Sequence, residues 1–291
     1  MNTRTYAVIG WPLGHSLSPI IQQAAFDAAK LDATYVAIPT PPGNEHRRFD
    51  EVRKGELSGL NVTIPHKRAA FHAMDSLTKA ARSLGAVNTV IYDNGKLRGD
   101  NTDMKGFLDS LRNFGRFDPA GANVTVLGAG GSACAVAHAL AASKPKSILV
   151  ANRTLRRAQE LASSVTKSRG MKIDASTLNA DQLEAQLSKS TLLVNTTSVG
   201  MVGGPEPDKS PVNPSWLHKH LLVFDIVYRP TTTPLLHAAK ARGAKTLGGL
   251  EMLVLQGAAS FKQWTGENPS LDVMFDAGKK ALSSNQPTGA L

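Results

Sequence analysis

The hydrophobic pattern of the chain changes repeatedly between the period of a strand and the period of a helix. In the first hundred residues, short alternating or apolar runs predict strands at 5–9, 34–38, 60–64, 85–92 and 96–99. Helical spacing predicts helices that begin at Ser18-Pro19, end near Lys54, and cover 66–74, 76–84 and 104–114. Strands that alternate with helices in this way predict an α/β fold.

A second series of strands and helices begins at residue 123. Strands are predicted at 123–127, 147–151, 171–174, 191–195, 221–227 and 245–247. Helices are predicted to about 143 and 168, at 233–242, 250–265 and 271–282, and the last residues are expected to fray. Repeated units of this kind predict a doubly wound parallel sheet.

Composition places the chain among ordinary globular proteins. Of its 291 residues, 42% are hydrophobic and 19% are charged, which is enough for about two domains. No apolar run approaches the roughly 18 residues of a membrane span, and the chain leads directly into a strand, so neither a membrane segment nor a signal peptide is expected. The single cysteine, Cys134, excludes an internal disulfide framework and predicts a cytoplasmic protein.

The net charge of +10 favours anionic partners. The basic residues form only short clusters, without a basic arm or an aromatic-interleaved stripe, and aromatic residues make up 5% of the chain. We therefore expect an anionic small molecule as the partner, and no nucleic acid.

A glycine-rich segment follows the strand at 123–127 directly. Gly128-Ala129-Gly130-Gly131-Ser132-Ala133 has the form G-x-G-x-x-A and opens a helix, which is the context of a dinucleotide-binding fingerprint. Gly128 supplies the tight turn, Gly130 lets the backbone approach a pyrophosphate, and Ala133 keeps the helix close to its strand. The alternative is a glycine turn without a ligand.

The next strand ends in Asn152-Arg153-Thr154, where an NAD site places Asp or Glu on the ribose hydroxyls. Arg153 can hold a 2′-phosphate through its guanidinium fork. These residues predict NADP over NAD, and surface arginines are the alternative. A further polar segment, 195–201, follows a strand at the ligand-facing edge of such a sheet.

Polar side chains also follow the strands of the first half. Pro65 must end the strand at 60–64, so Thr63 and Lys67 come at a strand end. Four more candidates, Ser16, Ser18, Asn88 and Asp103, lie at element junctions, and the polar Gln256 lies on the helix at 250–265. Structural alternatives stay open for several of them, because Lys67 could be solvated, Ser18 and Asp103 could cap helices, and Gln256 could lie on the surface.

In chain order these motifs resemble the shikimate dehydrogenase family over nearly the whole chain. The motifs are SLSP at 16–19, NVTIPHK at 61–67, GAVNT at 85–89, NTD at 101–103, GAGG at 128–131, NRT at 152–154, NTTSVGM at 195–201 and GGLEMLVLQ at 248–256. The resemblance implies an N-terminal α/β substrate-binding domain at 1–104, completed by helices at 250–284. It also implies a Rossmann-type NADP-binding domain at 105–249, which leaves a flexible tail at 285–291.

The resemblance implies NADP-dependent, reversible reduction of 3-dehydroshikimate to shikimate in aromatic amino-acid biosynthesis. Lys67 and Asp103 are implied as the catalytic pair. Substrate contacts are implied for Ser16, Ser18, Thr63, Lys67, Asn88, Asp103, Tyr228 and Gln256. NADP contacts are implied for residues 128–133 and 152–154 and for Thr197, Ser198, Val227, Gly249 and Met252, with no metal.

Two other functions remain open at this stage. A quinate or aminoshikimate dehydrogenase is one, although the small Ser18 and the NADP-type Arg153 favour shikimate. A non-catalytic NADP-sensing regulator is the other, although such a protein should lack Lys67 or Asp103. A monomer or a homodimer is expected.

Overall fold

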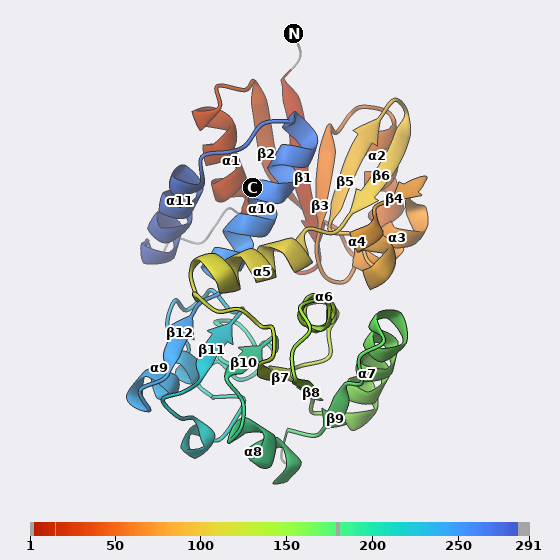
Figure 1. Cartoon of the computed structure of the whole chain (residues 1–291). Coiled ribbons are helices and arrows are strands. Elements are labelled where there is room, and N and C mark those ends of the chain that lie inside the picture. Colours follow the sequence, from red (N-terminus) through yellow and green to blue (C-terminus); the bar gives the residue numbers. More distant parts are fainter. Residues whose placement is uncertain (1–2, 15, 179–180, 285–291) are drawn as a thin grey trace. The chain divides into compact units, whose positions relative to one another are not determined.

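The structure is a computed structural model that describes residues 3–14, 16–178 and 181–284 (Figure 1). The tail predicted at 285–291 lies outside the described residues. The chain forms two compact units, one from Met1–Gly106 with Leu253–Leu291 and the other from Phe107–Met252. Each unit contains a six-stranded sheet with helices, which confirms the predicted α/β class. No helix in the described part of the chain is long and apolar enough to cross a membrane.

The first unit has a mixed sheet with the strand order β2-β1-β3-β5-β6-β4. Its strands are β1 (Arg4–Gly10), β2 (Ala33–Pro39), β3 (Gly59–Val62), β4 (Ser76–Leu77), β5 (Thr89–Asp93) and β6 (Lys96–Asp100). Its helices are α1 (Ser18–Ala28), α2 (Glu45–Arg53), α3 (Lys67–Ala73), α4 (Lys79–Leu84), the start of α5 (Asp103–Asn113), most of α10 (Leu250–Thr265), and α11 (Leu271–Ser283). β1, β2 and β3 run parallel, and β5 runs antiparallel to both β3 and β6.

Strand β3 is buried on both faces, although its alternating pattern predicts a half-buried strand. Leu60 and Val62 join an apolar cluster with residues of α2 and α3. On the other face Asn61 donates to Ser260 of α10 at 3.0 Å. Helix α10 returns from the far end of the sequence to cover this polar face, which local periodicity cannot predict. The strand ends at Val62, two residues before the predicted end at Ile64, and Ile64 is 62% exposed.

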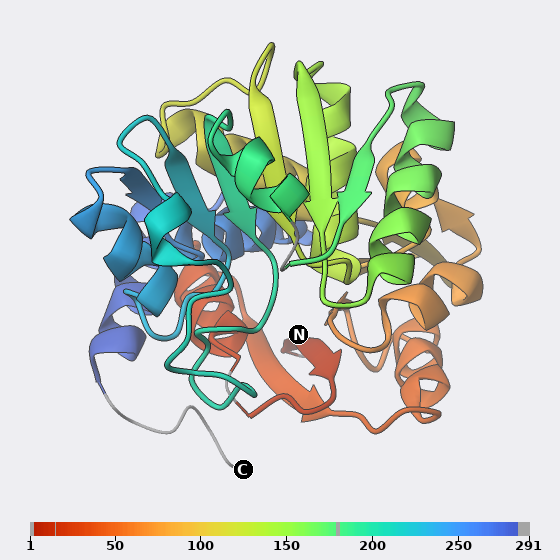
Figure 2. The ribbon, with the colours of Figure 1, turned by 90° about the horizontal axis from the view of Figure 1, so that it is seen from below.

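The second unit has an all-parallel sheet with the strand order β12-β11-β10-β7-β8-β9 (Figure 2). The strands are β7 (Asn123–Leu127), β8 (Ser147–Ala151), β9 (Asp174–Ser176), β10 (Leu192–Asn195), β11 (Leu222–Asp225) and β12 (Lys245–Leu247). The helices are α6 (Gly131–Ala142), α7 (Leu155–Arg169), α8 (Asp181–Leu187), α9 (Pro234–Ala241) and the short 3₁₀ helix η1 (Pro214–Trp216). Numbered within the unit, the order is 3-2-1-4-5-6, the doubly wound order of dinucleotide-binding sheets.

Three local predictions differ from the structure. Ser76–Leu77 form strand β4 beside β6, where a helix from residue 76 was expected. Strand β9 covers Asp174–Ser176 rather than 171–174, because its register is set by pairing with β8. Helix α8, at Asp181–Leu187, lies in a stretch for which the pattern predicted no element. It has less than two turns, and Leu183 and Leu187 gain their burial only from the core of the unit.

Candidate active site

One edge of the first sheet brings together three of the residues predicted to form the site. Asn61 of β3 and Asp100 of β6 both pair with Thr89, the first residue of the antiparallel strand β5. The ends of β3 and β6 therefore lie beside the start of β5. Lys67 begins α3 shortly after β3, Asn88 directly precedes β5, and Asp103 begins α5 shortly after β6.

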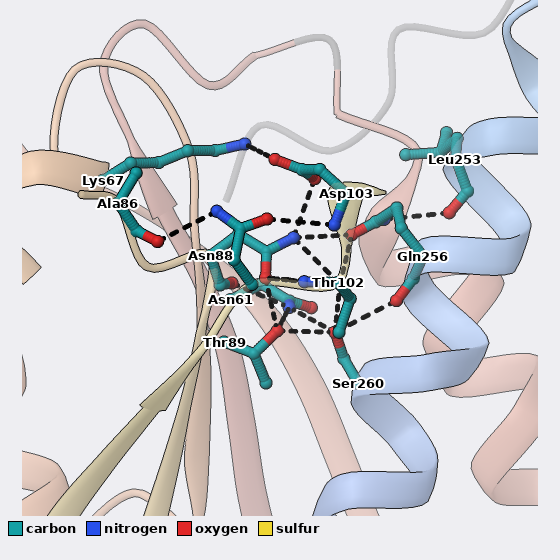
Figure 3. Close-up of polar contacts among 11 residues, drawn as sticks. Asn61, Lys67, Ala86, Asn88, Thr89, Thr102, Asp103, Leu253, Gln256 and Ser260 are labelled. Atoms are coloured by element: carbon teal, nitrogen blue, oxygen red, sulfur yellow. Dashed lines mark hydrogen bonds and ion pairs between the residues drawn. The ribbon is translucent and has the colours of Figure 1, made fainter. Parts of the chain in front are cut away.

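Lys67 and Asp103 form an ion pair at this edge (Figure 3). The ammonium Nζ of Lys67 donates to Oδ2 of Asp103 at 2.5 Å, with 18% of the lysine and 9% of the aspartate side chain exposed. The amide of Asn88 donates to the other carboxylate oxygen, Oδ1, at 2.8 Å. Two side chains therefore fix the plane of the Asp103 carboxylate, while the lysine keeps two of its three N–H donors for other partners.

Asn88 is the centre of the polar network around this pair. Its Nδ2 faces three acceptors, Thr102 Oγ1 at 2.9 Å, Asp103 Oδ1 at 2.8 Å and Gln256 Oε1 at 3.3 Å. Its Oδ1 accepts from the backbone N–H of Thr102 at 2.9 Å and from the hydroxyl of Thr89 at 2.8 Å. An amide has only two N–H hydrogens, so the three acceptors share them. Asn88 orients Asp103 and Gln256, and the residue is only 3% exposed.

Gln256 belongs to this network, so its interpretation as a surface residue is wrong. It lies on α10, half-buried, and its Oε1 accepts from Asn88 while its Nε2 donates to the carbonyl of Leu253 at 2.9 Å. Gly106 on α5 makes this approach possible, because a Cβ there would lie 2.8 Å from the Cβ of Gln256. The close packing of α5 on α10 brings Gln256 to Asn88 from a position 168 residues away in the sequence.

Ser16, Ser18 and Thr63 follow the parallel strands β1 and β3, and parallel strands end at one edge of a sheet. The predicted capping role of Ser18 is wrong. Leu17 is the N-cap of α1 without a side-chain cap, and Ser16 Oγ accepts from the backbone N–H of Ser18 at 3.3 Å. Within the described residues the hydroxyls of Ser18 and Thr63 make no hydrogen bond, so both can bind a ligand.

Asn61 and Ser260 complete the network, and no role is predicted for either from the sequence. Asn61 donates to Ser260 Oγ at 3.0 Å and to the carbonyl of Asn88 at 3.1 Å, and it accepts from the hydroxyl of Tyr35 at 2.7 Å. Ser260 also contacts Thr89 at 2.8 Å. A polar residue at the centre of an apolar strand is the one local signal that pointed to Asn61.

In the second unit the glycine-rich turn has the geometry that a dinucleotide requires. Gly128 has φ +105°, and a Cβ there would lie 2.5 Å from Thr196 Oγ1. Gly130 and Gly131 differ, because a Cβ at either position would meet no protein atom within 4 Å. Ala133 is fully buried in α6. The turn is therefore closed on its protein side and open on the other, where a pyrophosphate would bind.

The residues after β8 are arranged for an anion. Asn152 donates from Nδ2 to the carbonyl of Thr154 at 3.0 Å, which shapes the turn into α7. Arg153 and Thr154 are exposed, and Arg153 forms no ion pair among the described residues. Its charge helps Lys209 to lower the pKa of Glu206, which pairs with Lys209 at 2.8 Å. No described residue accepts a hydrogen bond from the guanidinium of Arg153, so its N–H groups can bind a 2′-phosphate.

The remaining predicted residues of the second unit follow β10 and β11. Thr197 donates from its backbone N and its Oγ1 to Asn195 Oδ1, at 3.0 and 2.7 Å. Val227 and Met252 are buried, Ser198 is exposed, and burial raises the pKa of the Tyr228 phenol. A Cβ on Gly249 would collide with the carbonyl of Ile226, so only glycine fits there. These residues lie in the second unit, whereas Lys67, Asn88, Asp103 and Gln256 lie in the first.

Three segments of the chain match known families. Residues 8–90 match the family described as "Shikimate dehydrogenase substrate binding domain", residues 111–230 match "Shikimate / quinate 5-dehydrogenase", and residues 249–277 match "Shikimate 5'-dehydrogenase C-terminal domain". A shikimate dehydrogenase (NADP(+)) from Methanopyrus kandleri is 42% identical over 280 residues, which cover 94% of each chain.

Solved structures agree with these matches. Shikimate 5-dehydrogenase from Thermus thermophilus, in complex with NADP(H) and shikimate, superimposes with a TM-score of 0.85 and 38% identity, over 96% of this chain and 100% of that chain. Quinate dehydrogenase from Corynebacterium glutamicum, in complex with NAD, superimposes with a TM-score of 0.87 and 30% identity, over 96% and 99%.

Proposed function

Because the chain belongs to the shikimate dehydrogenase family, we propose that it reversibly reduces 3-dehydroshikimate to shikimate with NADPH, a step of aromatic amino-acid biosynthesis. The Lys67–Asp103 ion pair carries this proposal. The reduction of a carbonyl to a hydroxyl needs a proton donor and a group that stabilises the oxyanion. An ammonium beside an oriented carboxylate can supply both.

Two N–H donors of Lys67 have no partner among the described residues, so they can bind the carbonyl oxygen and stabilise the charge that develops on it. Asp103, held by Asn88, orients the lysine and shares in the proton transfer. We assign these two as the catalytic residues, and we treat their proton as belonging to the coupled pair. NADPH supplies the hydride when it is bound.

The substrate is a polyhydroxylated ring carboxylate, and the first unit offers matching polar groups. We propose that the free hydroxyls of Ser18 and Thr63, together with Ser16, Asn88 and Gln256, bind its carboxylate and hydroxyls. Asn88 must exchange one of its internal hydrogen bonds to do so, because its two N–H groups already have acceptors. Tyr228 of the second unit is proposed as a further substrate contact.

For NADP, we propose that the turn at 128–133 holds the pyrophosphate and that Arg153, between Asn152 and Thr154, holds the 2′-phosphate. The open side of Gly130 and Gly131 supports this assignment, and so does the guanidinium of Arg153, which pairs with no described residue. Thr197, Ser198, Val227, Gly249 and Met252 are proposed as contacts of the nicotinamide half. The absence of Asp or Glu after β8 favours NADP over NAD.

We further propose that the protein acts in the cytoplasm as a monomer or homodimer and without nucleic acid. Its single cysteine suits a reducing compartment. Its positive charge is explained by an anionic substrate and cofactor.

Steady-state oxidation rates of shikimate and quinate, each with NADP+ and NAD+, test the proposed function. We expect the highest kcat/KM for shikimate with NADP+. Faster oxidation of quinate with NAD+ would identify a quinate dehydrogenase instead. NADP+ binding without turnover of any of these substrates would identify the non-catalytic regulator.

A further inference from the structure

A buried aspartate in the second unit is not among the proposed ligand contacts, and its hydrogen-bond partners belong to three different segments. Asp225 is the last residue of β11 and is 0% exposed. Its Oδ1 accepts from Asn195 Nδ2 at 2.9 Å and from the backbone N–H of Val227 at 3.1 Å. Its Oδ2 accepts from Thr233 Oγ1 at 2.7 Å. The carboxylate thus joins the end of β10, the segment after β11 and the start of α9.

Each of these partners, or its neighbour in the chain, contacts a further group. Asn195 accepts on Oδ1 from Thr197, through both its backbone N and its hydroxyl. Thr233 caps α9 by accepting from the backbone N–H of Leu236 at 3.2 Å. Val227 follows Ile226, whose carbonyl lies against Gly249. Asp225 therefore fixes the segments that carry Thr197 and Val227, and Gly249 packs closely against the second of them. All three residues are proposed contacts of the nicotinamide half of NADP.

Only a carboxylate satisfies all of these partners. The hydroxyl of Thr233 accepts from Leu236, so its single hydrogen must go to residue 225. The side chain at 225 must accept on both sides, whereas an asparagine would present N–H donors on one of them. The three groups that contact the carboxylate are uncharged, and burial raises the pKa of Asp225 to about 6. A buried charge opposes folding when none of its described partners carries the opposite charge. We therefore look for the role of Asp225 in the segments that it holds, not in stability.

We propose that Asp225 is a positioning residue that holds the ends of β10 and β11 in the conformation that receives the nicotinamide half of NADP. This inference rests on the proposed function, because that function places NADP on this edge of the sheet. Asp225 acts through Asn195, Val227 and Thr233 and touches no reacting atom.

Two ligands distinguish this role from general damage to the unit. NADP+ contains both halves of the cofactor, whereas adenosine 2′,5′-bisphosphate contains only the adenine half that Arg153 would bind. For Asp225→Asn we expect the Kd of NADP+, measured by calorimetric titration, to rise about tenfold, the effect of one hydrogen bond. The Kd of adenosine 2′,5′-bisphosphate should stay within about twofold of the wild-type value.

Three further variants complete the test. Thr233→Val removes the donor to Oδ2, so it should also raise the Kd of NADP+ and leave the Kd of adenosine 2′,5′-bisphosphate unchanged. This variant decides the question if Asp225→Asn does not fold. Thr233→Ser keeps the hydroxyl and should bind like the wild type. Asp100→Asn is the matched control, because Asp100 is a buried aspartate of the first unit that accepts from neutral groups, Thr78 Oγ1 and Gln263 Nε2. It should leave both affinities unchanged.

The outcomes separate this inference from the proposed function. A wild-type protein that does not bind NADP+ contradicts the proposed function itself. If the wild type binds NADP+ and Asp225→Asn binds each of the two ligands with the wild-type affinity, only the positioning role is wrong. If Asp225→Asn binds both ligands more weakly by the same factor, the positioning role is also wrong, because that result means general damage to the unit.

Discussion

Asn88 donates to Oδ1 of Asp103 at 2.8 Å, so a neutral amide holds the side of the carboxylate that Lys67 leaves free. The proposed catalytic pair is therefore oriented by a third residue that is itself anchored to Thr102 and Thr89. The loss of this amide should misplace the carboxylate without removing either member of the pair.

For Asn88→Ala we expect kcat/KM for shikimate to fall about 10- to 100-fold, because one charge-assisted hydrogen bond to Asp103 is lost. The Kd of NADP+ should not change, since Asn88 lies in the first unit. Steady-state kinetics and NADP+ titration measure the two effects. An unchanged kcat/KM would remove Asn88 from the orienting role.

The glycine-rich turn gives a prediction that separates protein stability from cofactor affinity. Gly128→Ala should destabilise the protein by about 1 kcal/mol or more, because φ is +105° and the new Cβ would meet Thr196. Gly130→Ala has φ −93° and an open position, so its melting temperature should match the wild type while NADP+ affinity falls. If Gly130→Ala binds NADP+ normally, the pyrophosphate does not lie against this turn.

Arg153 should set the choice between the two cofactors. For Arg153→Ala we expect the Kd of NADP+ to rise about 10- to 100-fold, the effect of a lost charge-assisted contact, with little change in the Kd of NAD+. Lys167→Ala is the matched control, because Lys167 is an exposed cation near the other end of α7. An equal rise in the Kd of NADP+ and of NAD+ would show that Arg153 does not hold the 2′-phosphate.

Asp225 predicts a pH dependence of stability. Its folded pKa of about 6 lies above the ordinary value of 3.8, so the folded state binds more protons between these two values. The free energy of unfolding should therefore rise as the pH falls from about 6 to about 4, by up to about 3 kcal/mol from this group. Denaturant unfolding of wild type and Asp225→Asn at pH 4 and pH 7.5 measures the effect. The wild type should gain more stability at low pH than the variant, and equal pH dependence in both proteins would contradict the assignment.

Most of the elements followed from local pattern, because strands such as β1 and β8 are short apolar runs and the apolar residues of α10 recur at helical spacing over 16 residues. The errors lie where tertiary contacts decide. Ser76–Leu77 become a strand by pairing with β6, and α8 forms because its leucines enter the core. Ser18 has the local signature of an N-cap, but Leu17 is the N-cap of α1, and the backbone N–H of Ser18 donates to Ser16 Oγ.

The candidate site was only partly predictable for the same reason. Lys67, Asn88 and Asp103 stand at element junctions, which sequence can locate, and Gln256 came from the family resemblance. Asn61 and Ser260 are 199 residues apart, and only the packing of α10 on β3 makes them partners. Asp225 was missed because a single aspartate at the end of an apolar strand carries no local signal of the three donors around it.

Lys67→Ala tests the central claim most directly, through NADP+-dependent oxidation of shikimate measured beside NADP+ binding. The variant removes the ammonium that pairs with Asp103 at 2.5 Å and leaves the second unit intact. We expect kcat to fall at least about 1000-fold, the combined effect of lost proton transfer and oxyanion stabilisation, while the Kd of NADP+ stays at the wild-type value. Turnover at the wild-type rate would contradict the catalytic role of the Lys67–Asp103 pair.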